Sequence, residues 1–166
     1  MHPLSAVATI ATVATFTAAG IVPNHRRSDV TALAPLIGEW QSDTVRGVSA
    51  RSTCVWTPRH GALLCEQRVE GPLGASTALN LFTADSVVGG FVLYVLSRPG
   101  STVAPLPLGI RGAEWFYGGR SPSNDGRWYR TVNDFSRADS YEWRQETSRD
   151  GKQWTAGIHG VSRRVH

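Results

Sequence analysis

The chain of 166 residues is poor in cysteine and in charge, and each shortage excludes a class of protein. Its two cysteines, Cys54 and Cys65, are too few for a disulfide-dense mini-domain or for a four-thiolate zinc site. Charged residues make up 18% of the chain and hydrophobic residues 41%, which is enough apolar material for a packed core and too little charge for a disordered chain. The length suits a single domain.

The positive charge of the chain is small, and nearly all of it is arginine. Seventeen basic residues stand against 13 acidic ones, for a net charge of +4, and Lys152 is the only lysine. A nucleic-acid-binding surface needs a basic stripe or an aromatic–basic motif. Here arginine and acid alternate, as in Glu142, Arg144 and Glu146, which predicts a solvated outer sheet face. We therefore expect no nucleic-acid partner.

The sequence also lacks the motifs of nucleotide, nucleophile and metal chemistry. It contains no glycine-rich phosphate loop and no Gly-x-Ser-x-Gly nucleophile elbow. Its histidines are scattered without metal-ligand spacing, at His2, His25, His60, His159 and His166. We expect neither a metal nor a cofactor.

Residues 1–28 differ in composition from the rest, and the folded domain is expected to be residues 29–166. Residues 4–22 carry no charge and consist mostly of Ala, Thr and Val. They could form the apolar centre of a signal peptide, and residues 17–19 could form its cleavage site. The basic residues with which a signal peptide begins are missing. Three alternatives remain open: an atypical signal peptide of an exported protein, a disordered extension of a cytoplasmic one, and an anchor helix. A stable membrane span is not expected, because it needs about 20 strongly apolar residues and threonine weakens this run.

From Leu33 onward, short β-type runs alternate with turn residues. The 17 Gly, 9 Pro and 6 Trp suit a turn-rich β protein, and no long stretch has a helical period. Pro/Gly clusters and Asp-Gly pairs favour hairpin loops between the runs. The pattern predicts an all-β fold, an antiparallel barrel of eight to ten strands. We expect strands near residues 37–47, 50–57, 62–70, 76–84, 90–97, 102–108, 112–119, 127–135, 140–148 and 152–164.

The first long hairpin identifies the inner face of the barrel. If residues 58–61 form its loop, Trp56 pairs with Leu63 and Cys54 with Cys65. Directly opposed residues point to the same face, so this apolar face is the inner one and both sulfurs lie on it. A disulfide and two buried thiols are the alternatives for the cysteine pair.

Large aromatic residues are expected to line the interior, and a solid core and a ligand cavity are the alternatives for what they form, of which the cavity is favoured. Alternation along the strands brings several of them to the faces expected to point inward, and a closed sheet of this size has room for one small ligand. The expected ligand-binding residues are Trp56, Tyr94, Trp115, Tyr117, Tyr141 and Trp143.

Short motifs mark the two ends of the domain: Gly38-Glu39-Trp40 opens the first expected strand, and Arg163 and Arg164 close the last. These motifs resemble those of the calycin superfamily, which includes the lipocalins and fatty-acid-binding proteins. Together with Trp56-Thr57-Pro58 and Asp150-Gly151-x-x-Trp154, these motifs resemble a family of bacterial lipocalin-like domains of unknown function over residues 33–165. The resemblance implies that Trp40 plugs one end of the barrel and that Arg163 or Arg164 packs across it.

Nitrobindin, a haem-binding ten-stranded barrel, is a more distant resemblance. It has further glycines after the Gly-x-Trp, which are missing here, and a histidine near the C-terminus binds its iron. That resemblance would make His159 a haem ligand.

The sequence therefore favours binding of a small apolar or aromatic ligand inside a lipocalin-like barrel. One alternative is a cofactor-free isomerase or cyclase acting on a polyketide- or terpenoid-like intermediate. The candidate proton donors for that chemistry are Tyr94, Tyr117, Tyr141 and His159, and the candidate carboxylates are Glu114 and Asp134. Nitrobindin-like haem binding is the second alternative.

Overall fold

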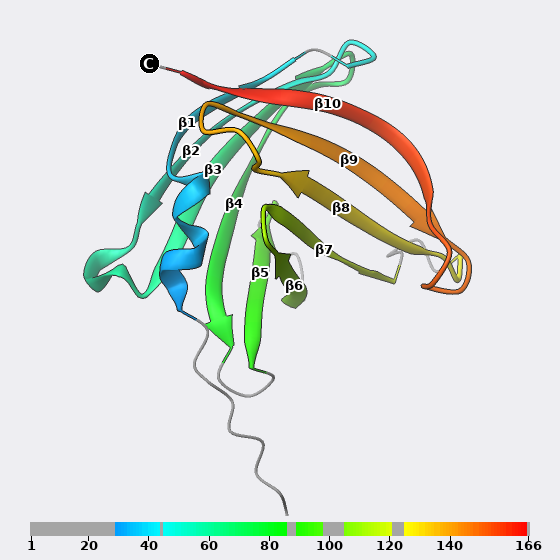
Figure 1. Cartoon of the computed structure of the whole chain (residues 1–166). Coiled ribbons are helices and arrows are strands. Elements are labelled where there is room, and N and C mark those ends of the chain that lie inside the picture. Colours follow the sequence, from blue (N-terminus) through cyan, green and yellow to red (C-terminus); the bar gives the residue numbers. More distant parts are fainter. Residues whose placement is uncertain (1–28, 44, 86–88, 98–104, 121–124, 166) are drawn as a thin grey trace, which may run out of the picture.

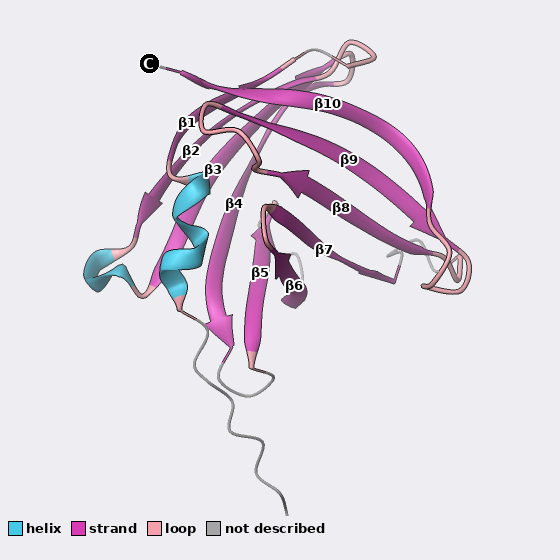
Figure 2. Cartoon of the chain, in the orientation of Figure 1, coloured by secondary structure: helices cyan, strands magenta, loops and turns pink. Residues whose placement is uncertain are grey.

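The fold is a closed antiparallel β-barrel of ten strands (Figures 1 and 2). The computed structural model describes residues 29–43, 45–85, 89–97, 105–120 and 125–165. Each strand pairs with its neighbours in sequence, and β1 pairs with β10 to close the cylinder, which confirms the up-and-down barrel expected from the sequence. The strands are β1 (Gly38–Ser42), β2 (Ser49–Trp56), β3 (Ala62–Gly71), β4 (Gly74–Asp85), β5 (Gly90–Leu96), β6 (Pro105–Arg111), β7 (Glu114–Arg120), β8 (Trp128–Asp134), β9 (Ser140–Ser148) and β10 (Thr155–Val165).

Two short 3₁₀ helices, η1 (Val30–Leu36) and η2 (Pro58–His60), complete the described chain. The expectations for residues 1–28 lie outside the described residues. None of the described helices is both long and apolar enough to cross a membrane.

The first expected strand, residues 37–47, is shorter in the structure and ends in a tight turn. β1 stops at Ser42, and Val45 and Val48 then exchange backbone hydrogen bonds of 2.8 and 2.9 Å around Arg46-Gly47. Both central residues have positive φ, 53° and 74°, as a two-residue hairpin turn of the primed type requires. The strand expected at residues 102–108 also differs, because β6 runs to Arg111 and turns at Gly112.

The β2–β3 hairpin has the register expected from the sequence. Trp56 pairs with Leu63, and Cys54 pairs with Cys65. The two cysteines form a disulfide with their Cα atoms 4.0 Å apart, and both are almost fully buried. The structure thus resolves the alternatives for the cysteine pair in favour of the disulfide.

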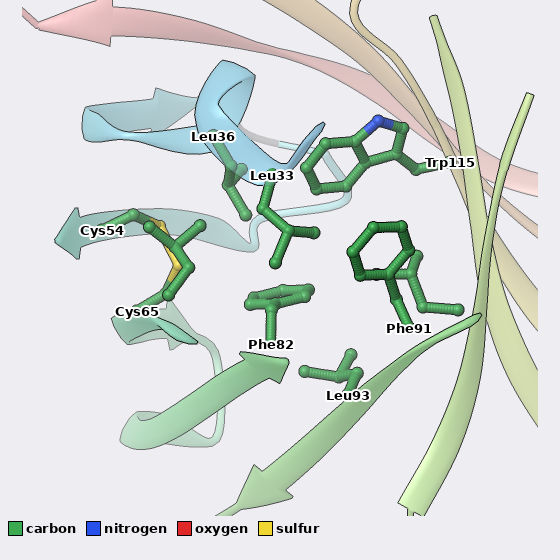
Figure 3. Close-up of a cluster of buried hydrophobic side chains, with 10 residues drawn as sticks. Leu33, Leu36, Cys54, Cys65, Phe82, Phe91, Leu93 and Trp115 are labelled. Carbon is green, nitrogen blue, oxygen red and sulfur yellow. A yellow bond between two sulfur atoms is a disulfide. The ribbon is translucent and has the colours of Figure 1, made fainter. Parts of the chain in front are cut away.

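Helix η1 fills the end of the barrel from which β1 starts. Its Leu33 and Leu36 are buried in a cluster with the disulfide and with side chains of β4, β5 and β7, such as Phe82 and Trp115. Figure 3 shows both leucines pointing from η1 into this cluster, with Cys54–Cys65 on one side and Trp115 on the other. This end of the barrel is therefore solidly packed.

Trp40 and Arg164 seal the same end. Trp40 is 1% exposed, and its indole N–H donates to the Leu36 carbonyl at 2.8 Å. The Arg164 guanidinium lies 4.3 Å from the Trp40 ring centroid and donates to the Ile37 and Pro35 carbonyls. A cation over an indole face is attractive, and here it also joins β10 to the segment between η1 and β1. Of the two arginines left open by the sequence, Arg164 is thus the one that closes the barrel, whereas Arg163 pairs with Asp43 at the surface.

Charged side chains of β7, β8 and β9 form a network on the outside of the barrel. Glu146 accepts from Arg144 and Arg130, and Arg144 also reaches Glu114 at 3.1 Å. Burial would raise the pKa of Glu146, but hydrogen bonds from the two guanidiniums outweigh it and lower that pKa. Arg130 also stacks 4.1 Å over Trp154. The alternation of acid and arginine in β9 therefore places charge on the outer face, as expected.

The close approach of Arg164 explains the glycine at position 38 and gives a test of the seal. Gly38 has φ +110°, and a Cβ there would lie 2.5 Å from Arg164 Nη1. Gly74 has nearly the same φ, +105°, but a Cβ there would meet nothing within 4 Å. We predict that Gly74→Ala lowers the free energy of unfolding by about 1–3 kcal/mol through backbone strain alone. Gly38→Ala should lower it by about 2 kcal/mol more, because Arg164 must move off Trp40. Urea unfolding of both variants measures the difference, and equal costs would show that the seal does not need the glycine.

Candidate functional site: an internal cavity

The barrel encloses a cavity of about 490 Å³. It runs from Leu36 of η1 to the β1–β2 connection, where the exposed Asp43 and Arg46 line it. Because the strands run up and down, this connection lies at the end of the barrel opposite η1. The barrel is thus packed at the η1 end and hollow beyond it.

One wall of the cavity is mainly apolar and belongs to β2–β5. Its floor is the Cys54–Cys65 disulfide with Leu36. The apolar lining residues of these strands are Ala50, Val69, Phe82, Leu93 and Val95. Four polar residues, Ser49, Ser52, Gln67 and Asn80, interrupt this wall. Asn80 Nδ2 donates a hydrogen bond of 3.5 Å to Gln67 Oε1.

The opposite wall is polar but uncharged and centres on two partly buried tyrosines, Tyr117 of β7 and Tyr141 of β9. Burial raises the pKa of Tyr117, although hydrogen bonds with Asn133 and Thr131 oppose the shift. Burial also raises the pKa of Tyr141, to about 12, against a hydrogen bond with Ser162. Both phenols are therefore neutral hydroxyl groups at physiological pH.

The register of the barrel places Thr131 and Ser162 beside the two phenols. Tyr117 is paired with Thr131 across β7 and β8, and Tyr141 is paired with Ser162 across β9 and β10. Ser162 is fully buried and its Oγ lies 2.7 Å from Ser42 Oγ on β1. A chain of hydroxyl groups therefore runs from the Tyr141 phenol to a residue that lines the cavity.

Trp143 lies between the polar wall and β10. A Cβ on Gly160 would come within 2.7 Å of the Trp143 ring, so the glycine lets the indole lie flat against β10. The indole nitrogen is buried and has no hydrogen-bond partner in the described part of the protein. Trp143 thus contributes mainly an apolar surface to the cavity.

Three of the six aromatic residues proposed from the sequence to bind a ligand line the cavity: Tyr117, Tyr141 and Trp143. Trp115 points inward but is 1% exposed in the packed end, 4.6 Å from the Phe135 ring. Trp56 packs against the same cluster, close to His60 of η2. Tyr94 is not among the lining residues, because Leu93 and Val95 on either side of it point into the cavity. The inward assignment of Tyr94 was therefore wrong.

Of the residues suggested for haem binding and for acid–base chemistry, Tyr117 and Tyr141 line the cavity, whereas His159, Glu114 and Asp134 are not among the lining residues. His159 is exposed on β10, opposite Arg144 of β9, so it cannot hold a haem iron inside the barrel. Glu114 pairs with Arg144 on the outside, and Asp134 accepts from the Ser136 backbone N–H. Among the described lining residues, Asp43 is the only carboxylate, and it forms an ion pair with Arg163.

The sequence interpretation missed most of the uncharged polar lining. Gln67, Asn80, Thr131 and Asn133 face the cavity from β3, β4 and β8. The signal for Gln67 was present, because it lies midway between Cys65 and Val69 on the face already assigned as inward. A polar residue at such a position indicates either a buried hydrogen bond or a cavity.

Neither metal chemistry nor a known relative defines the site. Within the described ranges, His, Cys, Asp and Glu nowhere gather in a group of three that could hold a metal ion. No protein-family model matches the sequence, and no curated protein matches it. The function must be argued from the cavity itself.

The raised pKa of Tyr141 gives a test of the polar wall. Between pH 10 and about pH 12 an unfolded chain loses the phenol proton while the folded one keeps it, so folding stability falls as the pH rises through this window. We predict that Tyr141 accounts for about 2 kcal/mol of the loss between pH 9 and pH 11.5, and that Tyr141→Phe reduces the loss correspondingly. Urea unfolding at pH 9 and at pH 11.5 measures it. An identical loss in the wild type and the variant would contradict the burial of this phenol.

Proposed function

We propose that this protein binds a small, largely apolar molecule inside its barrel. The observation that carries the proposal is the cavity of about 490 Å³ at the hollow end. Small-molecule sites of globular proteins are concave, predominantly apolar, and contain a few placed polar groups. The mainly apolar wall of β2–β5 and the hydroxyl-bearing wall of β7–β9 match that description.

We also propose that the chain is a lipocalin-like member of the calycin superfamily. The supporting arrangement is the Gly38-x-Trp40 segment at the start of β1 with Arg164 of β10 over the indole. This arrangement serves a ligand-binding barrel because it closes one end and leaves the other end hollow. In this proposal the polar wall orients the ligand. We do not assign it an acid–base step, because Asp43, the one described carboxylate of the lining, is ion-paired at the rim.

The cavity predicts binding of a neutral fluorescent probe, N-phenyl-1-naphthylamine, with a rise in its emission as it leaves water. Ser52 lines the cavity, whereas its neighbour Thr53 does not. We predict that Ser52→Phe weakens probe binding at least ten-fold by filling the space, and that Thr53→Phe leaves it within two-fold. Fluorescence titration measures both, with thermal unfolding as a check on folding. Equal effects of the two variants, or no binding by the wild type, would refute the proposed function.

We further propose that the protein is exported and that residues 1–28 contain its signal peptide. The support is the uncharged apolar run at residues 4–22 and the Cys54–Cys65 disulfide, since disulfides persist mainly in oxidising compartments. When the full-length gene product is expressed in its native host, the protein should be recovered outside the cytoplasm, with its N-terminus removed and its disulfide formed. Mass spectrometry of the fractions, with and without reduction, measures the cleavage and the disulfide. A full-length, reduced protein in the cytoplasm would refute export and leave ligand binding untouched.

A further inference from the structure

Four of the uncharged polar lining residues lie together on one region of the cavity wall. Tyr117 and Tyr141 project from β7 and β9, and Thr131 and Asn133 project from β8 between them. The two phenols are close enough for the charge of one to raise the pKa of the other. We name this group of four residues the hydroxyl–amide pole.

The phenol O–H groups of the hydroxyl–amide pole can donate hydrogen bonds to a ligand. A phenol oxygen can accept a hydrogen bond and still donate its own proton. The Tyr117 oxygen has the Thr131 hydroxyl and the Asn133 amide as neighbours that can donate to it, and the Tyr141 oxygen has Ser162. When these neighbours donate to the phenol oxygens, each phenol O–H is available to donate to a molecule in the cavity. Two such donors in a buried site suit a group that only accepts hydrogen bonds.

The charge of the lining restricts what that group can be. No described side chain of the hydroxyl–amide pole is charged, and the charged lining residues, Asp43 and Arg46, lie on the β1–β2 connection. An ionised ligand group buried at the pole would have no counter-charge, which is costly. A carbonyl oxygen accepts two hydrogen bonds and carries no charge, so it satisfies both phenols without this cost.

From this geometry we propose that the ligand is an uncharged molecule with a ketone-type carbonyl, which accepts hydrogen bonds from the Tyr117 and Tyr141 hydroxyls while its apolar body lies against Phe82, Leu93 and Val95. The inference rests on the proposed function, because it assigns an orientation to a molecule held in the same cavity. It adds a chemical class of ligand and names the residues that select it.

The test uses three naphthalenes of similar size as competitors of bound N-phenyl-1-naphthylamine: 2-acetylnaphthalene, 2-ethylnaphthalene and 2-naphthoate. We expect the ketone to bind at least five-fold more tightly than the ethyl compound, since a net hydrogen bond changes affinity roughly two- to ten-fold. The carboxylate should bind more weakly than the ketone. Equal binding of ketone and ethyl compound, or tightest binding of the carboxylate, would overturn the inference and leave the proposed function standing.

Variants at the pole identify the residues responsible. Tyr117→Phe and Tyr141→Phe should each weaken ketone binding roughly two- to ten-fold. Their affinities for the ethyl compound and for the naphthylamine probe should stay within two-fold of the wild-type affinities. Tyr94→Phe, which removes a hydroxyl outside the cavity, is the matched control and should change none of them. Ketone binding that survives both cavity variants would overturn the assignment.

A measurement on the wild type keeps the test independent of how the variants fold. The infrared carbonyl stretch of bound 2-acetylnaphthalene should lie below its position in hexane, because hydrogen bonding weakens the carbonyl bond. An unshifted stretch in a protein that binds the ketone would overturn the inference alone. Failure of all the neutral naphthalenes to bind would instead refute the proposed function, and this inference with it.

Discussion

The stacking of Arg164 on Trp40 is the contact on which the rest of the barrel depends. It joins β10 to the segment between η1 and β1, at the point where the ends of the domain must meet to close the cylinder. The guanidinium also bonds to the Ile37 and Pro35 carbonyls, so the same side chain holds η1 in place. With one end sealed in this way, Leu33 and Leu36 can complete a packed core, and the other end can stay hollow.

The molecule separates its charges from its cavity. Glu114, Arg130, Arg144 and Glu146 pair with one another on the outer face, where mutual hydrogen bonds stabilise them, including the buried carboxylate of Glu146. Facing inward, the same strands carry phenols, amides and hydroxyl groups, which can be buried once they are hydrogen-bonded. The alternation of side chains along a strand makes this separation possible, because one sequence supplies two faces of different chemistry.

The disulfide joins the packed and the hollow ends of the barrel. Cys54 and Cys65 touch Leu33 and Leu36 on one side and form part of the cavity lining on the other. The covalent bond links β2 to β3 at the boundary between the cavity and the core. The shape of the binding space therefore depends on the same residues that stabilise the η1 end.

Turn residues and side-chain alternation are local signals, so the residues alone predicted the all-β class, a barrel of eight to ten strands and the β2–β3 register. They also assigned Tyr117, Tyr141 and Trp143 to the inner face. Which arginine seals the end could be known only from the folded barrel, since adjacent residues of a strand point to opposite faces and nothing local says which face meets Trp40; it is Arg164 and not Arg163. The folded barrel was also needed to place Trp115 in the core and Tyr117 in the cavity, because their surroundings depend on how far η1 reaches into the barrel. Side-chain alternation shows which face a residue lies on, but not its position along the barrel axis.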